Sequence, residues 1–194
     1  SIILKRGYPG VIYIVYINTH KLMFHLCLMR DLMYRKLKSK ALQEVAVNSQ
    51  GVSAVSICCG RGSELIILGK VMGRGCNLLG IDHNVDNLSV ALNRISKSGI
   101  GNNVILKQMD AKDYRPVGVD YAVCCFGISY IQEPSQVIGL WLESLNNDGK
   151  LLIIDWDKHD IWGDILKKYS TNYSKKIETD SISIRSIIFT KDSL

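Results

Sequence analysis

Short runs of consecutive apolar residues alternate along this chain with longer segments in which apolar residues recur every three or four positions. The runs predict buried strands, and the longer segments predict helices with one apolar face. The predicted strands cover residues 52–57, 77–82, 103–109, 119–127 and 151–156. The predicted helices begin after residue 62, at residue 87 and at residue 134. This alternation predicts an α/β fold built around a parallel sheet.

Both ends of the chain carry less regular patterns. Residues 11–17 form an apolar run that predicts either a strand or a segment covering another apolar surface. Residues 20–48 have apolar residues at helical spacing, which predicts one or two helices. We interpret residues 1–50 as an N-terminal helical cap or lid, and residues 51–194 as the main globular domain. Near the C-terminus, residues 157–173 predict a helix plus loop, and residues 177–191 predict one or two strands.

Composition excludes several classes of protein. With 47% hydrophobic and 22% charged residues, the 194-residue chain has the balance of an ordinary soluble domain. Its net charge of +6 is modest, and no basic groove with interleaved aromatic residues is visible. A nucleic-acid partner is therefore possible but not favoured. No apolar run approaches the roughly 20 residues of a membrane span, and the sequence leaves the oligomeric state open.

The cysteines favour a reducing compartment. No C-x-x-C or paired Cys/His spacing is present, so we expect no metal site. Most of the cysteines lie inside apolar runs, where thiols act as small hydrophobic groups. Free thiols suit a cytoplasmic location. The six positions are Cys27, Cys58, Cys59, Cys76, Cys124 and Cys125.

A glycine turn follows the first strong strand. Residues 52–62 read V-S-A-V-S-I-C-C-G-R-G, so the apolar run ends in Gly60-Arg61-Gly62. A strand, a tight turn and a helix in this order are typical of nucleotide sites, because glycines let the backbone approach a ligand and helix N–H groups point at it. Twenty residues later, Asp82 ends the next predicted strand, where a carboxylate can accept hydrogen bonds from both ribose hydroxyls.

The sequence of the turn helps to distinguish between two kinds of adenosine cofactor, a dinucleotide and S-adenosylmethionine (SAM). A dinucleotide fingerprint needs G-x-G-x-x-G, but Cys58 and Leu65 stand at its first and third glycine positions. The segment S-I-C-C-G-R-G at residues 56–62 instead resembles the D-x-G-C-G-x-G motif of class I SAM methyltransferases. Ser56 departs from the acid of that motif, and Cys58 departs from its first glycine. A nucleotide-dependent oxidoreductase remains an alternative.

Three later segments extend the resemblance, which covers roughly residues 52–156. Asp110-Ala111 resembles the short acidic motif after the third strand of the family, with Asp113 as a competing acid. Phe126-Gly127 and the residues after it resemble the F-G segment of ubiquinone and menaquinone C-methyltransferases. The stretch L-x-x-D-G-K-L-L-I-I-D-W at residues 145–156 is similar to the family's fifth-strand segment.

The resemblance implies a Rossmann-like, doubly wound, mostly parallel seven-stranded sheet with helices on both faces, and SAM as cofactor. Ribose would bind Asp82, and adenine would lie by Asp110 and Ala111. His83 would either pack on adenine or be an exposed loop residue. The methionine end of the cofactor would be bordered by Cys58, Cys59, Gly60, Gly62 and the backbone of Phe126.

The implied function is methyl transfer from SAM to a small-molecule acceptor by in-line substitution. No catalytic residue is assigned, because positioning and exclusion of water carry most of such a reaction. Ser129, Tyr130 and His159 are conceivable groups on the acceptor side. Besides the oxidoreductase, two alternatives stay open: an inactive methyltransferase-like scaffold, motivated by Ser56 and Cys58, and an RNA, DNA or protein methyltransferase, motivated by the basic balance. The absence of an N-P-P-Y segment after the fourth strand lowers the case for base methylation.

Overall fold

The computed structural model describes residues 2–6, 12–16, 35, 38–43, 51–100, 104–157, 161–169, 173–179 and 182–190. The chain divides into two compact units, Ser1–Leu37 and Lys38–Leu194. In the first unit, β1 (Ile2–Arg6) pairs antiparallel with β2 (Ile12–Tyr16). Most of the helical stripe predicted for residues 20–48 lies outside the described residues, whereas residues 38–43 are helical and belong to the second unit. The cap at residues 1–50 stays a prediction.

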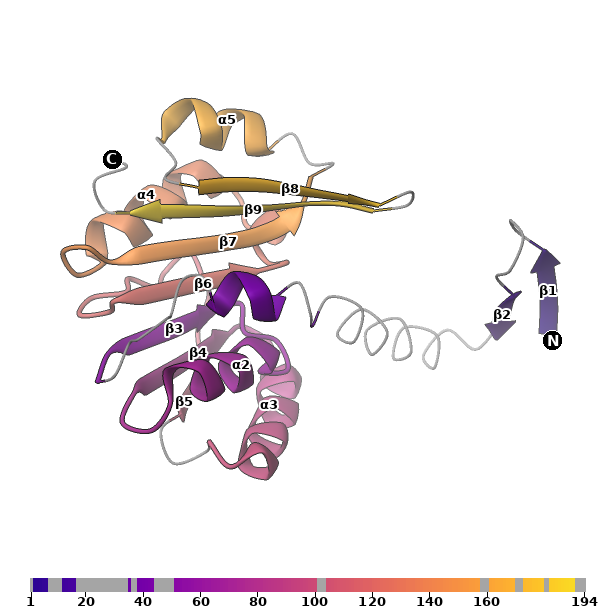
Figure 1. The fold of residues 1–194 in the computed structure, drawn as a ribbon, viewed down its shortest axis with the longest axis horizontal. Coiled ribbons are helices and arrows are strands. Elements are labelled where there is room, and N and C mark those ends of the chain that lie inside the picture. Colours follow the sequence, from indigo (N-terminus) through magenta and orange to yellow (C-terminus); the bar gives the residue numbers. More distant parts are fainter. Residues whose placement is uncertain are drawn as a thin grey trace. The chain divides into compact units, whose positions relative to one another are not determined.

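One sheet organises the second unit (Figure 1). Its strands are β3 (Ser53–Ile57), β4 (Asn77–Asp82), β5 (Val104–Gln108), β6 (Tyr121–Cys125), β7 (Lys150–Trp156), β8 (Tyr173–Thr179) and β9 (Ile182–Thr190). Their order is β5-β4-β3-β6-β7-β9-β8. The first five run parallel, and β9 is antiparallel to both β7 and β8. The predicted α/β, mostly parallel, Rossmann-like architecture is confirmed.

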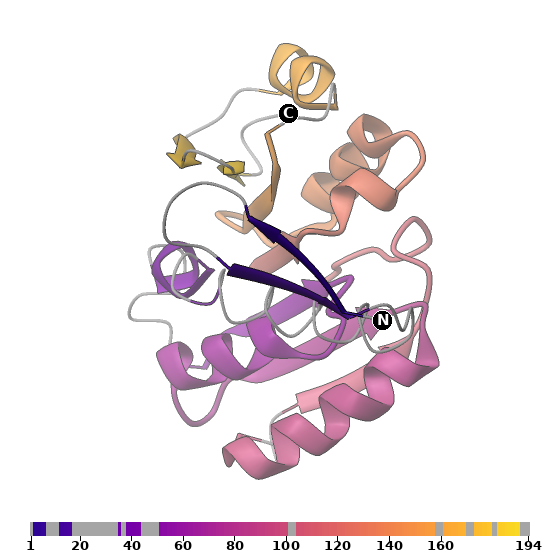
Figure 2. The same cartoon turned by 90° about the vertical axis from the view of Figure 1, so that its right-hand side faces the viewer.

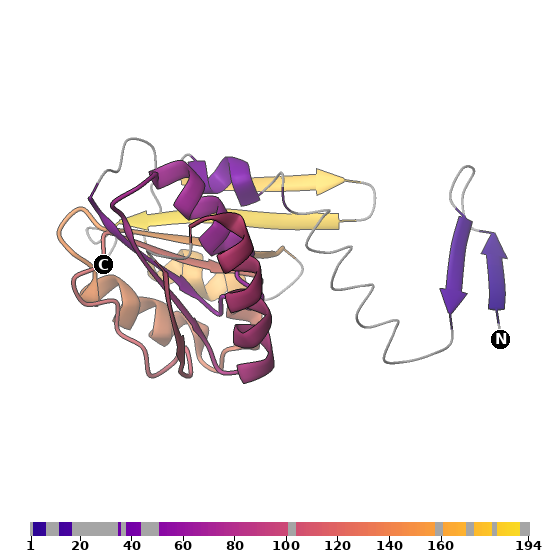
Figure 3. The same cartoon turned by 90° about the horizontal axis from the view of Figure 1, so that it is seen from below.

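Helices cover both faces of this sheet (Figures 2 and 3). The helices are α2 (Ser63–Met72), α3 (Val85–Ser98), α4 (Pro134–Ser144) and α5 (Ile161–Lys168), with a 3₁₀ turn η2 (Ile128–Tyr130). On one face α2 packs against α3, and on the other α4 packs against α5. The α4 side holds a large core that includes the completely buried side chains of Trp141, Ile57, Cys124 and Phe189. No helix within the described residues is long and apolar enough to span a membrane.

Side-chain hydrogen bonds define where β6 and α3 begin, and both boundaries differ by two residues from those that the sequence pattern predicts. The fourth predicted strand begins at Tyr121 rather than at residue 119, because the Asp120 carboxylate accepts hydrogen bonds from the Ser53 N–H (2.9 Å) and from Asn146 Nδ2 (2.7 Å). Helix α3 begins two residues earlier than predicted. The Asn84 side chain caps it by accepting from the N–H groups of Asp86 and Asn87.

The strand order places the carboxyl ends of β3 and β6 at a topological switch point. The chain runs from β3 outward to β4 and β5, then crosses back to β6 and continues to β7 on the other side. In open α/β sheets, ligands bind in the crevice that forms where the strand order reverses in this way. The glycine turn after β3 and the loop after β6 both lie at this point.

Candidate functional site

The glycine turn after β3 is a left-handed backbone segment. Gly60 and Gly62 have φ angles of 50° and 76°, and the turn is closed by a 2.9 Å hydrogen bond from the Gly62 N–H to the Cys59 carbonyl. A Cβ added to Gly60 would meet no atom of the described residues within 4 Å, so the backbone at Gly60 faces open space. A Cβ on Gly62 would lie 3.0 Å from Ala91 Cβ, so this glycine lets α3 pack against the turn.

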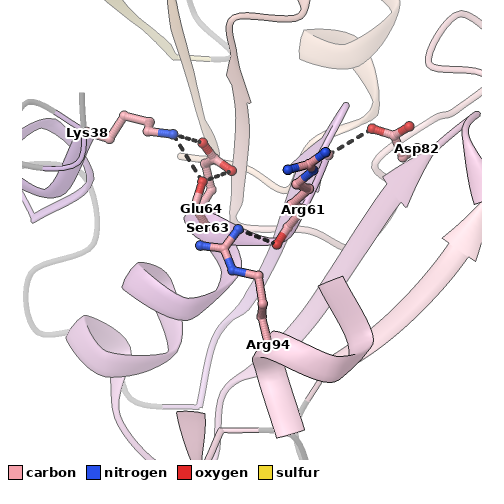
Figure 4. Close-up of polar contacts among 7 residues, drawn as sticks. Lys38, Arg61, Ser63, Glu64, Asp82 and Arg94 are labelled. Carbon is pink, nitrogen blue, oxygen red and sulfur yellow. Dashed lines mark hydrogen bonds and ion pairs between the residues drawn. The ribbon is translucent and has the colours of Figure 1, made fainter. Parts of the chain in front are cut away.

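Asp82 is joined directly to that turn (Figure 4). It ends β4, is 6% exposed, and accepts a 2.8 Å hydrogen bond from the Gly60 N–H on Oδ2 and a 2.9 Å bond from the Asn84 N–H on Oδ1. A carboxylate has about four lone-pair sites, so each oxygen keeps further acceptor capacity. The structure thus brings together the two features that the sequence separates by twenty residues.

Three further predicted residues lie after β4 and β5, which pair side by side. His83 is exposed, and its carbonyl accepts a 3.1 Å bond from Gln108 Nε2. Asp110 is also exposed, and its Oδ1 accepts a 3.0 Å bond from the Lys112 N–H, which closes a local turn. Ala111 is buried, with its carbonyl accepting a 3.2 Å bond from Trp141 Nε1. These residues border the same sheet edge as Asp82.

The loop after β6 touches the glycine turn. Phe126 has a φ of 56°, is 8% exposed, and stacks at a tilt on Trp156, with 5.3 Å between the ring centroids. A Cβ added to the next residue, Gly127, would lie 2.6 Å from Cys58 Cβ. Cys58 is itself left-handed, with a φ of 55°. The Cys58 side chain therefore fills the space that a side chain at residue 127 would need, and Gly127 leaves that space free. This complementarity explains how a cysteine fits at position 58, where the family motif has a glycine.

A buried ion pair beside the turn is not indicated by any sequence pattern (Figure 4). Lys38 Nζ lies 2.7 Å from Glu64 Oε1 and donates to Ser63 Oγ at 3.0 Å, while the Ser63 hydroxyl donates to Glu64 Oε2 at 3.0 Å. The Lys38 and Glu64 side chains are 5% and 7% exposed. Lys38 Nζ also lies 6.0 Å from the centroid of the Phe126 ring. The two charges are 26 positions apart in the sequence.

Three buried cysteines near the site, Cys59, Cys124 and Cys125, have raised pKa values. Burial raises the pKa of Cys59, and the nearby carboxylates of Asp82 and Glu64 raise it further. A hydrogen bond with Cys58, followed by burial, raises the pKa of Cys124. Burial does the same for the pKa of Cys125. All the described cysteines are free of disulfides, so these three supply packing rather than a thiolate nucleophile.

The residues proposed for the acceptor side differ in their surroundings. The Ser129 N–H and hydroxyl both donate to the fully buried Asp155 carboxylate, at 3.2 and 3.3 Å, whereas Tyr130 is 76% exposed. His159 lies outside the described residues.

Ser56 Oγ is buried with no hydrogen-bond partner among the described residues. The described residues hold no group of three or more His, Cys, Asp or Glu side chains that could bind a metal ion.

Comparison with known sequences places most of the second unit in one family. A family model described as a methyltransferase domain matches residues 48–191. A demethylmenaquinone methyltransferase from Lactobacillus johnsonii is 30% identical over 128 residues, which cover 65% of this chain and 49% of that protein. The chain thus spans about half the length of this curated relative.

Solved structures share the fold. A SAM-dependent methyltransferase from Aquifex aeolicus matches with a TM-score of 0.62 and 19% identity, over 79% of this chain and 89% of that one. A magnesium protoporphyrin IX methyltransferase from Synechocystis PCC 6803, with bound S-adenosylhomocysteine, matches with a TM-score of 0.66 and 16% identity, over 80% and 82% of the two chains.

Proposed function

The chain belongs to the class I SAM-dependent methyltransferase family, and we propose that it transfers a methyl group from SAM to a small-molecule acceptor. The observation that carries this proposal is the hydrogen bond between the Gly60 N–H and the buried Asp82 carboxylate. This bond holds the carboxylate against a backbone turn that is open to a ligand, where it would accept hydrogen bonds from ribose hydroxyls. The residues at the switch point therefore fit SAM.

The roles of the individual residues are part of the proposal. Asp82 would bind the ribose, and the bare backbone at Gly60 would let the cofactor come close. His83, Asp110 and Ala111 would border adenine on the β4 and β5 side. The methionine end would lie toward α2, bordered by Cys58, Cys59, Gly62 and Phe126.

The chemistry demands little beyond alignment. SAM, when bound, supplies a methyl group that its sulfonium already activates. The protein must then hold the acceptor in line and exclude water, and positioning of this kind offsets roughly 7–11 kcal/mol of a barrier. The buried Phe126 and its partner Trp156 provide an apolar wall at the carboxyl end of β6. Asp155 holds the Ser129 hydroxyl in place at the same end of the sheet.

An apolar, quinone-like acceptor is the first to test. The relative from Lactobacillus johnsonii is named for demethylmenaquinone, and the F-G segment at Phe126 and Gly127 resembles that of quinone C-methyltransferases. We further propose that residues 1–50 cap the acceptor side. A cytoplasmic location is proposed because the described cysteines, four of the five buried, form no disulfides.

A transfer assay with methyl-labelled SAM tests the proposal. The purified protein is given a demethylated prenyl naphthoquinone or bulk tRNA, and label is counted in the organic and nucleic-acid fractions. We expect label in the quinone, its loss in Asp82→Ala, and its retention in Asp86→Asn, which removes an equal charge from the exposed first turn of α3. Label in tRNA would support the nucleic-acid alternative. Absence of both SAM binding and transfer would favour the scaffold alternative, which the departures at Ser56 and Cys58 from the family motif motivate.

A further inference from the structure

Two thiols, those of Cys58 and Cys124, lie side by side next to the glycine turn. Strands β3 and β6 are neighbours in which Ile57 lies opposite Cys124, and Cys58 is the next residue after Ile57 (Figure 1). A Cβ added to Gly127 would lie 3.1 Å from Cys58 Sγ and 3.2 Å from Cys124 Sγ, and a hydrogen bond joins the two thiols. Both sulfurs therefore border one small space, which Gly127 leaves free.

The backbone at Cys58 turns its side chain toward Cys124. Consecutive side chains of a strand point to opposite faces of a sheet. Cys58 nevertheless packs against the same core as Ile57 and Cys124, because its left-handed φ of 55° ends the regular strand. Adjacent strands lie about 4.8 Å apart, and the Cα atoms of a disulfide lie about 4.4–6.8 Å apart. Two cysteines one step apart on adjacent strands, with side chains on one face, can therefore be joined.

Disulfides between consecutive cysteines fit the geometry less well. Cys59 directly follows Cys58, and Cys125 directly follows Cys124. Consecutive Cα atoms are about 3.8 Å apart, which is closer than the roughly 4.4 Å at which disulfide geometry usually begins. The Cys59 sulfur also lies on the α2 face of the sheet, 3.1 Å from the point that a Gly80 Cβ would occupy. Cys124 thus has Cys58 as its neighbour on the α4 face.

The two thiols differ in their access to solvent. Cys58 is half-buried in the turn, whereas Cys124 is completely buried. The hydrogen bond with Cys58, followed by burial, raises the pKa of Cys124, so the buried thiol stays protonated and is a poor first nucleophile. An accessible thiol with a second thiol beside it is typical of redox-sensitive sites, where the first reacts with the oxidant and the second completes a disulfide.

We propose that Cys58 and Cys124 form a reversible disulfide when a peroxide oxidises the chain. The Cys58 thiolate attacks one peroxide oxygen, the O–O bond breaks, and hydroxide leaves and takes up a proton. The Cys124 sulfur then attacks the sulfur of the Cys58 sulfenic acid, the S–O bond breaks, and the oxygen leaves as water with the Cys124 proton. Two thiols and one hydrogen peroxide thus give one disulfide and two waters. The new bond ties the glycine turn after β3 to β6.

Peptide mapping of the folded native chain after treatment with hydrogen peroxide tests the proposal. Remaining thiols are blocked with iodoacetamide before digestion with trypsin, which places Cys58 and Cys59 in residues 41–61, and Cys124 and Cys125 in residues 113–150. We expect these two peptides to be joined with the loss of two hydrogen atoms, and to separate again after reduction with dithiothreitol. Fragmentation between the neighbouring cysteines should identify the joined sulfurs as those of Cys58 and Cys124, without any variant.

Matched variants give a second reading of the same link. Cys58→Ala and Cys124→Ala should each lose the joined peptides. Cys59→Ala and Cys125→Ala, which remove the directly neighbouring thiols, should retain them. The proposal would be overturned by the absence of joined peptides in the oxidised native chain, by a link through another cysteine such as Cys27, or by oxidation of Cys58 that stops at the sulfinic acid.

Discussion

Replacing Gly127 by alanine should destabilise the protein through one contact between two loops. The Gly127 backbone, with φ of −122° and ψ of −27°, is open to alanine, so the penalty comes from space alone. The new Cβ would lie 2.6 Å from Cys58 Cβ, 3.1 Å from Cys58 Sγ and 3.2 Å from Cys124 Sγ. Overpacking of a filled core costs about 1–3 kcal/mol, and we expect the free energy of unfolding to fall by an amount in that range.

Cys58→Gly should rescue Gly127→Ala. It removes the two contacts with Cys58 and leaves only Cys124 Sγ close to the new methyl group. It also removes a left-handed backbone strain of about 1–2 kcal/mol, offset in part by the roughly 0.5–1 kcal/mol entropic cost of a glycine. Urea denaturation of the native chain, both single variants and the double variant gives the coupling free energy, which should exceed about 1 kcal/mol. Additive effects within about 0.5 kcal/mol would refute the proposed complementarity of Cys58 and Gly127.

Two further predictions concern packing and pH. Gly139→Ala should destabilise the protein by about 1–3 kcal/mol, since its Cβ would lie 2.5 Å from the Tyr169 hydroxyl that bonds the Ser135 carbonyl; Gly163→Ala, in an open position of α5, should instead stabilise by up to about 1 kcal/mol. Thermal unfolding that lowers the Tm of both variants equally would contradict this. Burial raises the pKa of Tyr114 to about 12 from its ordinary value near 10, so the folded state keeps a proton that the unfolded state loses, and stability should fall as pH rises from 10 toward 12. Denaturation between pH 9 and 11.5 should show a smaller fall for Tyr114→Phe, and identical slopes would count against a buried neutral phenol.

Local patterns predict most of the fold and the centre of the candidate site. The apolar runs and glycine turns place β3 to β7 to within a few residues, because buried parallel strands and amphipathic helices have distinct periods. Asp82 and Gly60 are predicted as neighbours because parallel strands end at one edge of a sheet. The boundaries at Asp120 and Asn84 depend on side-chain hydrogen bonds, which periodicity does not encode.

Features that depend on distant contacts are not visible in the sequence. Lys38 reads as one of several early basic residues, and its burial against Glu64 follows only from the packing of residues 38–43 on α2. Cys58 reads as a departure from a glycine pattern until Gly127, 69 positions later (127 − 58), is seen to make room for it. Both contacts join segments that lie far apart in the sequence, whereas hydrophobic periodicity reflects only near neighbours along the chain.

Binding of SAM is the central claim, and calorimetric titration of the native chain, Asp82→Ala and Asp86→Asn measures it most directly. We predict binding in the micromolar range by the native chain and by Asp86→Asn. Loss of two charge-assisted hydrogen bonds to ribose should weaken Asp82→Ala by at least about 100-fold. Near-UV circular dichroism of each variant checks that the fold persists. Native-like affinity in a folded Asp82→Ala, or no binding by the native chain, would contradict the assignment of this edge of the sheet as the cofactor site.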